Sequence, residues 1–293
     1  MTLALKLLVS GLALGAVYSL IAMGYSTVYK ASGLMNFVQG DVLTLGAFLG
    51  LTFHKILGLP YWLSLILTVV CAMAFGMLIE KGIIRRLLNR NLNAIYIILA
   101  TIAVSYIIQN GSFLIWGGVT EYFPSMFDKA TIDLFGIKVQ PEAILCFTVA
   151  LFTMLLMHLF MNMTKLGTAM RAASMDARAA ESCGINVSLT TGLTWGIATA
   201  IASVAGMIVG PMYGVYVSLG SALGGKAFAG AVMGGFGNMY GAMVGGLLLG
   251  LLETFISGFV SSTYKNLIAY LLLLVFLFIK PTGLFNEKAI QDI

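Results

Sequence analysis

Long apolar runs alternate with short polar breaks along the whole chain. Most of these runs approach the roughly 20 residues that a helix needs to cross the hydrocarbon core of a bilayer. The nine runs lie at 5–29, 33–53, 61–80, 93–116, 142–162, 189–210, 225–238, 240–258 and 264–280. The pattern predicts an all-α, polytopic membrane protein with about eight to nine transmembrane helices. We expect one transmembrane domain over residues 1–293, and we interpret the first run as a span rather than a cleaved signal.

Two of the runs are interrupted by polar or flexible positions. The run at 225–238 is short and broken by glycines, and the run at 33–53 holds polar residues near its start. These residues are Asn36, Gln39, Gly40 and Asp41. Irregular backbone at membrane depth is tolerated only where protein or a water-filled cavity covers it. Both runs are therefore predicted to be discontinuous or half-depth helices.

Composition narrows the class of protein. Apolar residues make up 60% of the chain and charged residues 9%, against about 25% charged in an ordinary soluble domain. This balance argues against soluble enzymes and nucleic-acid-binding modules, and it makes the lipid bilayer the expected surroundings. The three cysteines and two histidines are widely separated, so we expect neither a disulfide framework nor a metal site.

The positions of the basic residues predict an orientation. All five arginines lie in the breaks 81–92 and 163–188, which the positive-inside rule assigns to the cytoplasm. The break between them, 117–141, carries mixed charges and is expected outside. Its charged residues are Glu121, Asp128, Lys129, Asp133 and Lys138. Counting spans then places the N-terminus outside and the C-terminus in the cytoplasm, provided that both interrupted runs cross the membrane.

The cytoplasmic segment 163–188 is the longest break that carries arginines. Residues 168–183 are rich in alanine and lack proline, so they predict one helix that ends at Gly184. Mixed charges and small side chains suit docking onto a soluble partner, although a solvated loop is equally compatible with them. The residues of interest are Gly167, Arg171, Ala172, Asp176, Ala180 and Gly184.

Two acidic residues lie well inside predicted spans, where a carboxylate is a functional candidate. Asp41 precedes an apolar run, so we favour capping of that helix over contact with substrate or ion. Asn36 and Gln39 are expected to satisfy backbone groups freed by the interruption. For Glu253 we favour a partner helix or a polar interior over ion coupling.

A glycine belt over 224–250 repeats small residues four positions apart, the pattern that lets helix backbones approach closely. The glycines of the belt that we expect to pack helices are Gly230, Gly234, Gly237, Gly241, Gly245, Gly246 and Gly250. The segment 220–227 resembles a phosphate-binding loop, but Ala227 replaces the final Ser/Thr and no strand–loop–helix pattern surrounds it. The sequence therefore predicts no nucleotide site and no enzyme active site in this chain.

The chain resembles the permease subunits of branched-chain amino-acid ABC importers over nearly its whole length. Five motifs in order carry the resemblance. The first is the segment 11–25, and the second is Asn36-Phe37 followed by Gly40-Asp41. The third runs from Gly167 through Arg171-Ala172, Asp176 and Ala180 to Gly184-Ile185-Asn186. The fourth is Lys226-Ala227-Phe228 together with 234–237 and Gly241-Ala242, and the fifth is Pro281-Thr282-Gly283-Leu284.

The resemblance implies a transport subunit of a bacterial or archaeal inner membrane that passes branched-chain or other hydrophobic amino acids. A second permease, identical or homologous, completes the pathway, and an extracytoplasmic binding protein delivers the substrate. Two cytoplasmic ATPase subunits bind the coupling loop 163–188 and use ATP and Mg, while this chain binds no cofactor. Relatives with the same signatures import urea or short amides. An ion-coupled carrier using Asp41 or Glu253 is the remaining alternative.

Overall fold

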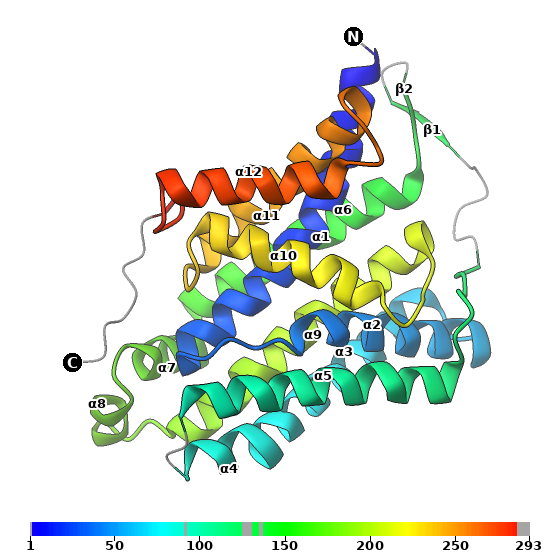
Figure 1. Ribbon diagram of the computed structural model, residues 1–293. Helices are drawn as coiled ribbons and strands as arrows, with labels where there is room; N and C mark the ends of the chain where they lie inside the picture. Colours follow the sequence, from blue (N-terminus) through cyan, green and yellow to red (C-terminus); the bar gives the residue numbers. More distant parts are fainter. Residues whose placement is uncertain (1, 91–92, 125–130, 135–136, 286–293) are drawn as a thin grey trace.

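The computed structural model describes residues 2–90, 93–124, 131–134 and 137–285. These residues form a helical bundle, so the predicted all-α membrane fold is confirmed (Figure 1). The helices are α1 (Thr2–Ser32), α2 (Gln39–Leu51), α3 (Tyr61–Ile79), α4 (Arg85–Leu88), α5 (Ala94–Trp116), α6 (Pro141–Met163), α7 (Lys165–Met175), α8 (Ala177–Ser182), α9 (Val187–Tyr213), α10 (Leu219–Gly234), α11 (Met239–Phe259) and α12 (Lys265–Ile279). Short π-helical turns follow α2 at Thr52–Ile56 and α3 at Glu80–Ile84.

Every predicted apolar run contains a helix, and six helices are long and apolar enough to cross a membrane by length and composition. They span Ala4–Ser32, Tyr61–Leu88, Ile95–Trp116, Pro141–Met163, Val187–Tyr213 and Met239–Phe259. The helices α2, α10 and α12 are shorter. The run at 33–53 is helical only from Gln39, and α10 begins at Leu219 rather than at 225. With 16 residues α10 is about 24 Å long.

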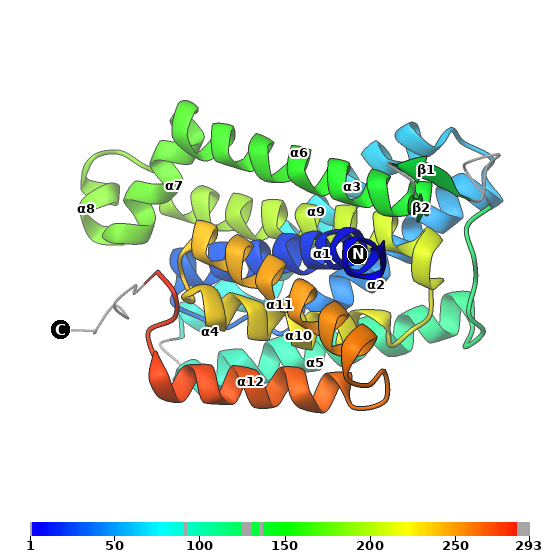
Figure 2. The same cartoon turned by 90° about the horizontal axis from the view of Figure 1, so that it is seen from above.

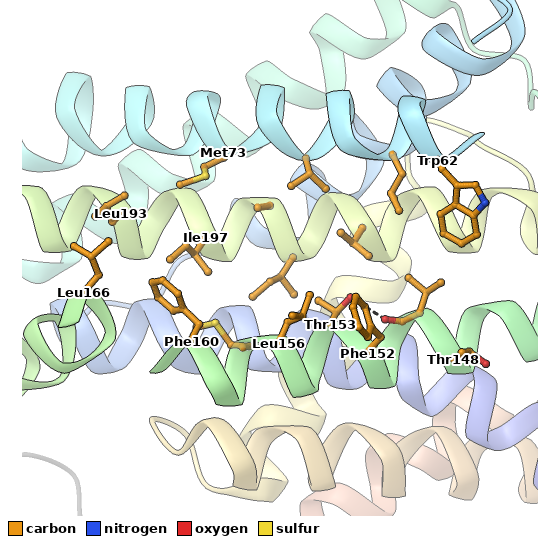
Figure 3. A pocket seen from close by; sticks show the side chains of 17 residues that line it. Trp62, Met73, Thr148, Phe152, Thr153, Leu156, Phe160, Leu166, Leu193 and Ile197 are labelled. Carbon is orange, nitrogen blue, oxygen red and sulfur yellow. Dashed lines mark hydrogen bonds between the residues drawn. The ribbon is translucent and has the colours of Figure 1, made fainter. Parts of the chain in front are cut away.

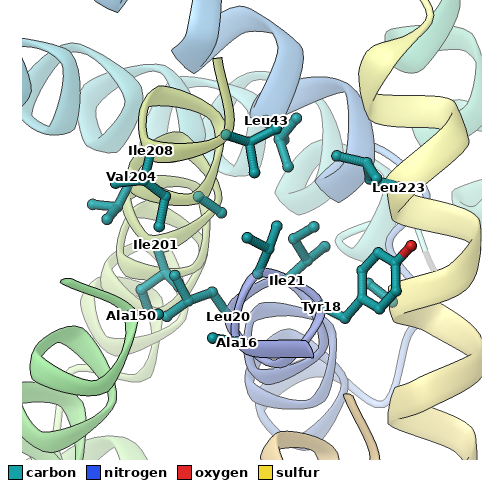
Figure 4. Packing of buried hydrophobic residues seen from close by; sticks show 14 of the residues in the cluster. Ala16, Tyr18, Leu20, Ile21, Leu43, Ala150, Ile201, Val204, Ile208 and Leu223 are labelled. Carbon is teal, nitrogen blue, oxygen red and sulfur yellow. The ribbon is translucent and has the colours of Figure 1, made fainter. Parts of the chain in front are cut away.

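Two helices, α1 and α9, cross the middle of the bundle (Figure 2). In the core, Leu20 and Ile21 of α1 point toward Leu43 of α2 and toward Ile201 and Ile208 of α9 (Figure 4). The outer faces of α3, α5, α6 and α12 instead expose large apolar side chains. Examples are Leu78, Leu114, Phe152 and Phe278. An apolar exterior of this kind is what a hydrocarbon solvent requires.

The two ends of the bundle carry different connections. At one end lie α7 and α8, and at the other lies a hairpin of β1 (Ile132–Leu134) and β2 (Ile137–Val139) (Figure 2). In the hairpin the backbone of Asp133 lies opposite that of Lys138, inside the break 117–141, where no strand was predicted. The N-terminus lies near the hairpin (Figure 1). Asp128, Lys129 and residues 286–293 lie outside the described residues, and the membrane orientation of both ends stays a prediction.

The glycine belt lies where α11 contacts α10 and α1. A Cβ atom added to Gly234 would lie 1.9 Å from the carbonyl oxygen of Gly241, and one added to Gly250 would lie 2.2 Å from Gly15 Cα. A Cβ atom on Gly230, Gly245 or Gly246 would also lie within 2.1–2.9 Å of backbone atoms. Only glycine fits such contacts. Gly237 differs from the prediction because it lies in the α10–α11 turn with φ of +99°, so it shapes the turn instead of packing two helices.

Candidate functional site

The chain breaks between α1 and α2, in the segment 33–38. Asn36 Oδ1 accepts a hydrogen bond from the backbone N–H of Val38 at 3.0 Å. Gln39 Nε2 donates to the carbonyl oxygen of Ala198 in α9 at 2.8 Å. Asn36 therefore bonds to a backbone group of the interruption, as predicted. Gln39 does not, because its partner is a carbonyl group inside α9, and this bond holds the start of α2 against that central helix.

Asp41 lies in the first turn of α2, but it does not cap the helix. The residue at the cap position is Val38, which makes no side-chain capping bond. The carboxylate instead turns toward α5, where it accepts hydrogen bonds from Ser105 Oγ and, at 2.9 Å, from Gln109 Nε2. The capping interpretation was wrong because α2 starts at Gln39, three residues earlier than a helix capped by Asp41 would start.

A cavity of about 410 Å³ opens beside this carboxylate between α2, α5 and α10. One part of its lining is polar and comprises Asp41, Ser105 and Gln109. Another part is aromatic and comprises Tyr25, Phe37 and Phe228. The ring of Phe228 lies 5.5 Å from that of Tyr25 and 5.8 Å from that of Phe37, centroid to centroid. The cavity thus offers an apolar surface and a buried carboxylate to the same small molecule.

The starts of α2 and α10 meet at the wall of the cavity. A Cβ atom added to Gly40 would lie 2.6 Å from the carbonyl oxygen of Gly220, and one added to Gly220 would strike Gly40 in turn. The backbone N–H of Gly220 donates to Thr44 Oγ1 at 2.7 Å. The two short helices therefore contact each other, backbone to backbone, at their first turns. Gly40 allows this close approach because it has no side chain.

Glu253 occupies a different setting, in a junction of four helices. Its Oε1 accepts from Lys226 Nζ of α10 at 2.6 Å, and its Oε2 accepts from the Tyr18 hydroxyl of α1 at 2.8 Å. Lys265 Nζ of α12 lies 3.8 Å from Oε1. The contact with partner helices is the outcome that the sequence analysis favoured. It paired neither Tyr18, Lys226 nor Lys265 with Glu253, although a lysine inside an apolar run is a signal that a buried carboxylate lies nearby.

The segment 163–188 folds as two short helices, so the predicted single helix over 168–183 is wrong. Asp176 has an extended backbone between α7 and α8, and its side chain accepts from the N–H of Ala179 at 2.9 Å. Aspartate favours such a capping position over a helix interior. Gly184 does end α8, with φ of +81°.

The predicted residues of this loop divide between two faces. Gly167 and Ala180 are buried against the bundle. A Cβ atom on Gly167 would lie 2.4 Å from the carbonyl oxygen of Phe160, so glycine allows α7 to fold back on α6. Arg171, Asp176 and Gly184 are exposed, and Ala172 is half-buried. Met175, 84% exposed at the end of α7, also lies on the accessible side, and the sequence analysis missed it.

A larger groove of about 750 Å³ lies between α3, α6 and α9 (Figure 3). Its lining is apolar apart from Thr148 and Thr153, whose hydroxyls donate to carbonyl groups one turn earlier in α6. Each of these hydroxyls already makes a hydrogen bond to the backbone. The groove is therefore a poor candidate for a polar solute, and the smaller cavity beside Asp41 is the better one.

Comparison with known proteins places the chain in a family. Residues 7–277 match the family described as "Branched-chain amino acid transport system / permease component". The high-affinity branched-chain amino acid transport system permease protein BraD of Pseudomonas aeruginosa is 33% identical over 196 residues, 62% of each chain. LivH of Salmonella typhimurium, of the same description, is 32% identical over 194 residues, again 62% of each.

A more distant relative comes from an archaeon. The probable branched-chain amino acid transport permease protein LivH of Methanocaldococcus jannaschii is 29% identical over 178 residues, 58% of this chain and 55% of its own. The chain thus spans less than two thirds of the length of the curated relatives it matches. The family match, by contrast, covers nearly all of the helical bundle. The chain is a multi-pass membrane protein that belongs to the family of permease components of branched-chain amino acid transport systems.

Proposed function

We propose that this chain is the transmembrane permease subunit of an ATP-binding-cassette importer in a bacterial or archaeal inner membrane. It passes branched-chain or other hydrophobic amino acids that an extracytoplasmic binding protein delivers. The observation that carries the proposal is the cavity beside Asp41 in a member of this family, with aromatic rings and a buried carboxylate facing one space.

The chemistry of the cavity fits a hydrophobic amino acid. The rings of Tyr25, Phe37 and Phe228 offer apolar surface to an aliphatic side chain, and the carboxylate of Asp41 offers a hydrogen-bond acceptor to an ammonium group. Urea and short amides have little apolar surface to place against three rings. The aromatic wall therefore favours amino acids over these smaller solutes.

The energy source in this proposal is outside the chain. Two ATPase subunits, which use ATP and Mg, bind the accessible side of α7 and α8, where Arg171, Met175 and Asp176 are exposed. A second permease, identical or homologous, packs against this one to complete the pathway. In this arrangement α7 and α8 face the cytoplasm, and the hairpin and the N-terminus face outside. Their positions at opposite ends of the bundle support it (Figure 2).

Crosslinking from adjacent positions in α8 tests the ATPase contact. Ala179 is exposed and Ala180 is only 4% exposed, so the two are a matched pair. We expect Ala179→Cys to crosslink to a co-purified ATPase and Ala180→Cys to fail. Purification of the chain from its native membrane without any ATPase would overturn the importer proposal.

Uptake into liposomes separates the importer from an ion-coupled carrier. The full assembly with its binding protein should take up labelled leucine only when ATP is present on the side of the liposome membrane where the ATPase subunits lie. Excess urea should not compete with leucine. The chain alone should be inactive under sodium or proton gradients. Gradient-driven uptake by the chain alone, lost in Asp41→Asn, would identify a carrier instead.

A further inference from the structure

A chain of polar side chains connects α7 to the first turn of α11. Arg171 Nη1 in α7 donates to Asn162 Oδ1 near the end of α6 at 3.1 Å. Asn162 Nδ2 donates to the hydroxyl of Tyr240 in α11 at 3.0 Å. That hydroxyl lies 2.8 Å from Nδ1 of His158, whose ring packs edge-on against the tyrosine with centroids 5.6 Å apart.

Both polar atoms of the Asn162 amide, the Tyr240 hydroxyl and His158 Nδ1 each have a hydrogen-bonding partner in this network of side chains. The amide of Asn162 uses its oxygen toward α7 and its nitrogen toward α11, so one side chain joins both helices. The tyrosine hydroxyl accepts from Asn162 and can donate to the unprotonated Nδ1 of His158. The Nδ2 group also contacts the carbonyl oxygen of His158 at 3.0 Å, which fixes the amide plane. The three side chains therefore act as one unit.

Apolar packing between α7 and the bundle is incomplete at this place. A small cavity of about 30 Å³ lies between α1, α6, α7 and α11, and Met170, Arg171 and Met239 line it. The buried hydroxyl of Ser26 also lines it and makes no hydrogen bond to a described residue. A gap transmits displacement poorly because its walls lack contact. The hydrogen bonds from Arg171 through Asn162 to Tyr240 supply a direct connection across the same junction.

The connection enters α11 at a stiff point. Asn238 caps this helix, and its Oδ1 accepts from the N–H groups of Tyr240 and Gly241, both at 3.0 Å. At the residue directly after Tyr240, α11 packs backbone to backbone on α10 through Gly234 and Gly241. Because α10 forms part of the cavity beside Asp41, a displacement at Tyr240 reaches the cavity wall through rigid contacts.

We propose that Asn162 and Tyr240 are positioning residues that hold α7 to α11 and transfer the movement of the coupling loop to α10. This inference rests on the importer function proposed above. Neither residue faces the cavity beside Asp41. Tyr240 is 42% exposed, so removing its hydroxyl should leave the fold intact and change only the linkage.

Hydrogen exchange on the chain alone in lipid nanodiscs tests the attachment without any ATPase. In Tyr240→Phe the amide of Asn162 loses its anchor on α11, so amide exchange over α7 (Lys165–Met175) should rise, by about fivefold if the Arg171–Asn162 hydrogen bond is lost with it. The control is Tyr264→Phe, an equally conservative change of a 61% exposed tyrosine at the start of α12. Equal exchange over α7 in the two variants would overturn the proposal.

The complete assembly tests the transfer of movement. Tyr240→Phe should lower the number of substrate molecules imported per ATP by about fivefold while ATP hydrolysis continues, and Tyr264→Phe should not. The double variant Asn162→Ala/Tyr240→Phe should be no worse than Asn162→Ala alone, because both act in one linkage. Additive losses would contradict it. A wild-type chain that binds no ATPase refutes the importer, whereas intact import with unchanged coupling in Tyr240→Phe refutes only this inference.

Discussion

Of the three carboxylates that are buried among the described residues, Glu80 at 2% exposure pairs with Arg85, whereas Asp41 at 3% and Glu253 at 2% have contrasting surroundings. Asp41 meets only uncharged donors, Ser105 and Gln109, and it borders a cavity. Glu253 meets an ammonium group at 2.6 Å and a tyrosine hydroxyl inside a packed junction of helices. Burial alone therefore does not identify a site for a solute. A carboxylate with uncharged partners beside open space can receive a ligand, whereas a fully paired one holds helices together.

The largest effect should come from Glu253→Gln. This change leaves the ammonium of Lys226, whose side chain is only 14% exposed, without its counter-charge, which should cost about 3–5 kcal/mol of stability. The midpoint of thermal unfolding in detergent measures it. The double variant Lys226→Met/Glu253→Leu should recover most of the loss because no unpaired charge remains. A wild-type midpoint for Glu253→Gln would mean that the pair is not structural.

The effect of adding a methyl group should also differ between the surroundings of Glu253, which are tightly packed, and those of Asp41, which are open. Gly250 lies three residues before Glu253, and a Cβ there would lie 2.2 Å from Gly15 Cα. Gly111 lies two residues after Gln109, and a Cβ there would meet nothing within 4 Å. Gly250→Ala should therefore cost about 1–3 kcal/mol. Gly111→Ala should gain about 0.5–1 kcal/mol from its lower backbone entropy. Thermal unfolding of both variants decides the comparison, and equal shifts would refute it.

Asp41→Asn should affect transport more than stability. Asparagine keeps an oxygen that accepts from Gln109, so the unfolding midpoint should stay close to that of the wild type. Loss of the charge should lower ATP-driven uptake of leucine by about tenfold, since a hydrogen bond to a charged group contributes about 1.5–3 kcal/mol. A large drop in the unfolding midpoint of Asp41→Asn, together with normal uptake by the protein that remains folded, would contradict this assignment. Asp41 would then have the structural role that we assign to Glu253.

The smallest effect should come from Lys265→Met. Its ammonium lies 3.8 Å from Glu253, and its side chain is 38% exposed, so solvent screens the interaction. Stability should change by less than about 1 kcal/mol, far below the effect of Glu253→Gln. A loss as large as that of Glu253→Gln would make Lys265, rather than Lys226, the principal partner of the carboxylate.

Hydropathy was sufficient to locate the helices because each must bury or expose an apolar surface about 20 residues long. It failed where local geometry decides the outcome. The start of α10 at Leu219 was missed because glycine and serine there weaken the apolar signal, and the break at Asp176 was missed because composition does not place caps. The hydrogen-bonding partners of Asp41 lie at least 64 residues away in the sequence, and those of Glu253 lie at least 27 residues away. Spacing along the sequence could therefore not reveal them. Lys265, whose ammonium is 3.8 Å from Glu253, is nearer in the sequence but makes the longer contact.

The contact between the first turns of α2 and α10 has an electrostatic consequence. The N-terminus of a helix carries a partial positive charge of roughly half an elementary unit, which falls off within a turn. Gly40 and Gly220 bring two such ends together beside Asp41, so peptide dipoles stabilise its negative charge without a basic side chain. The electric potential at this carboxylate consequently depends on where α10 begins relative to α2. A displacement of α10 along α2 would change the attraction for a cationic group in the cavity, even with every side chain unaltered.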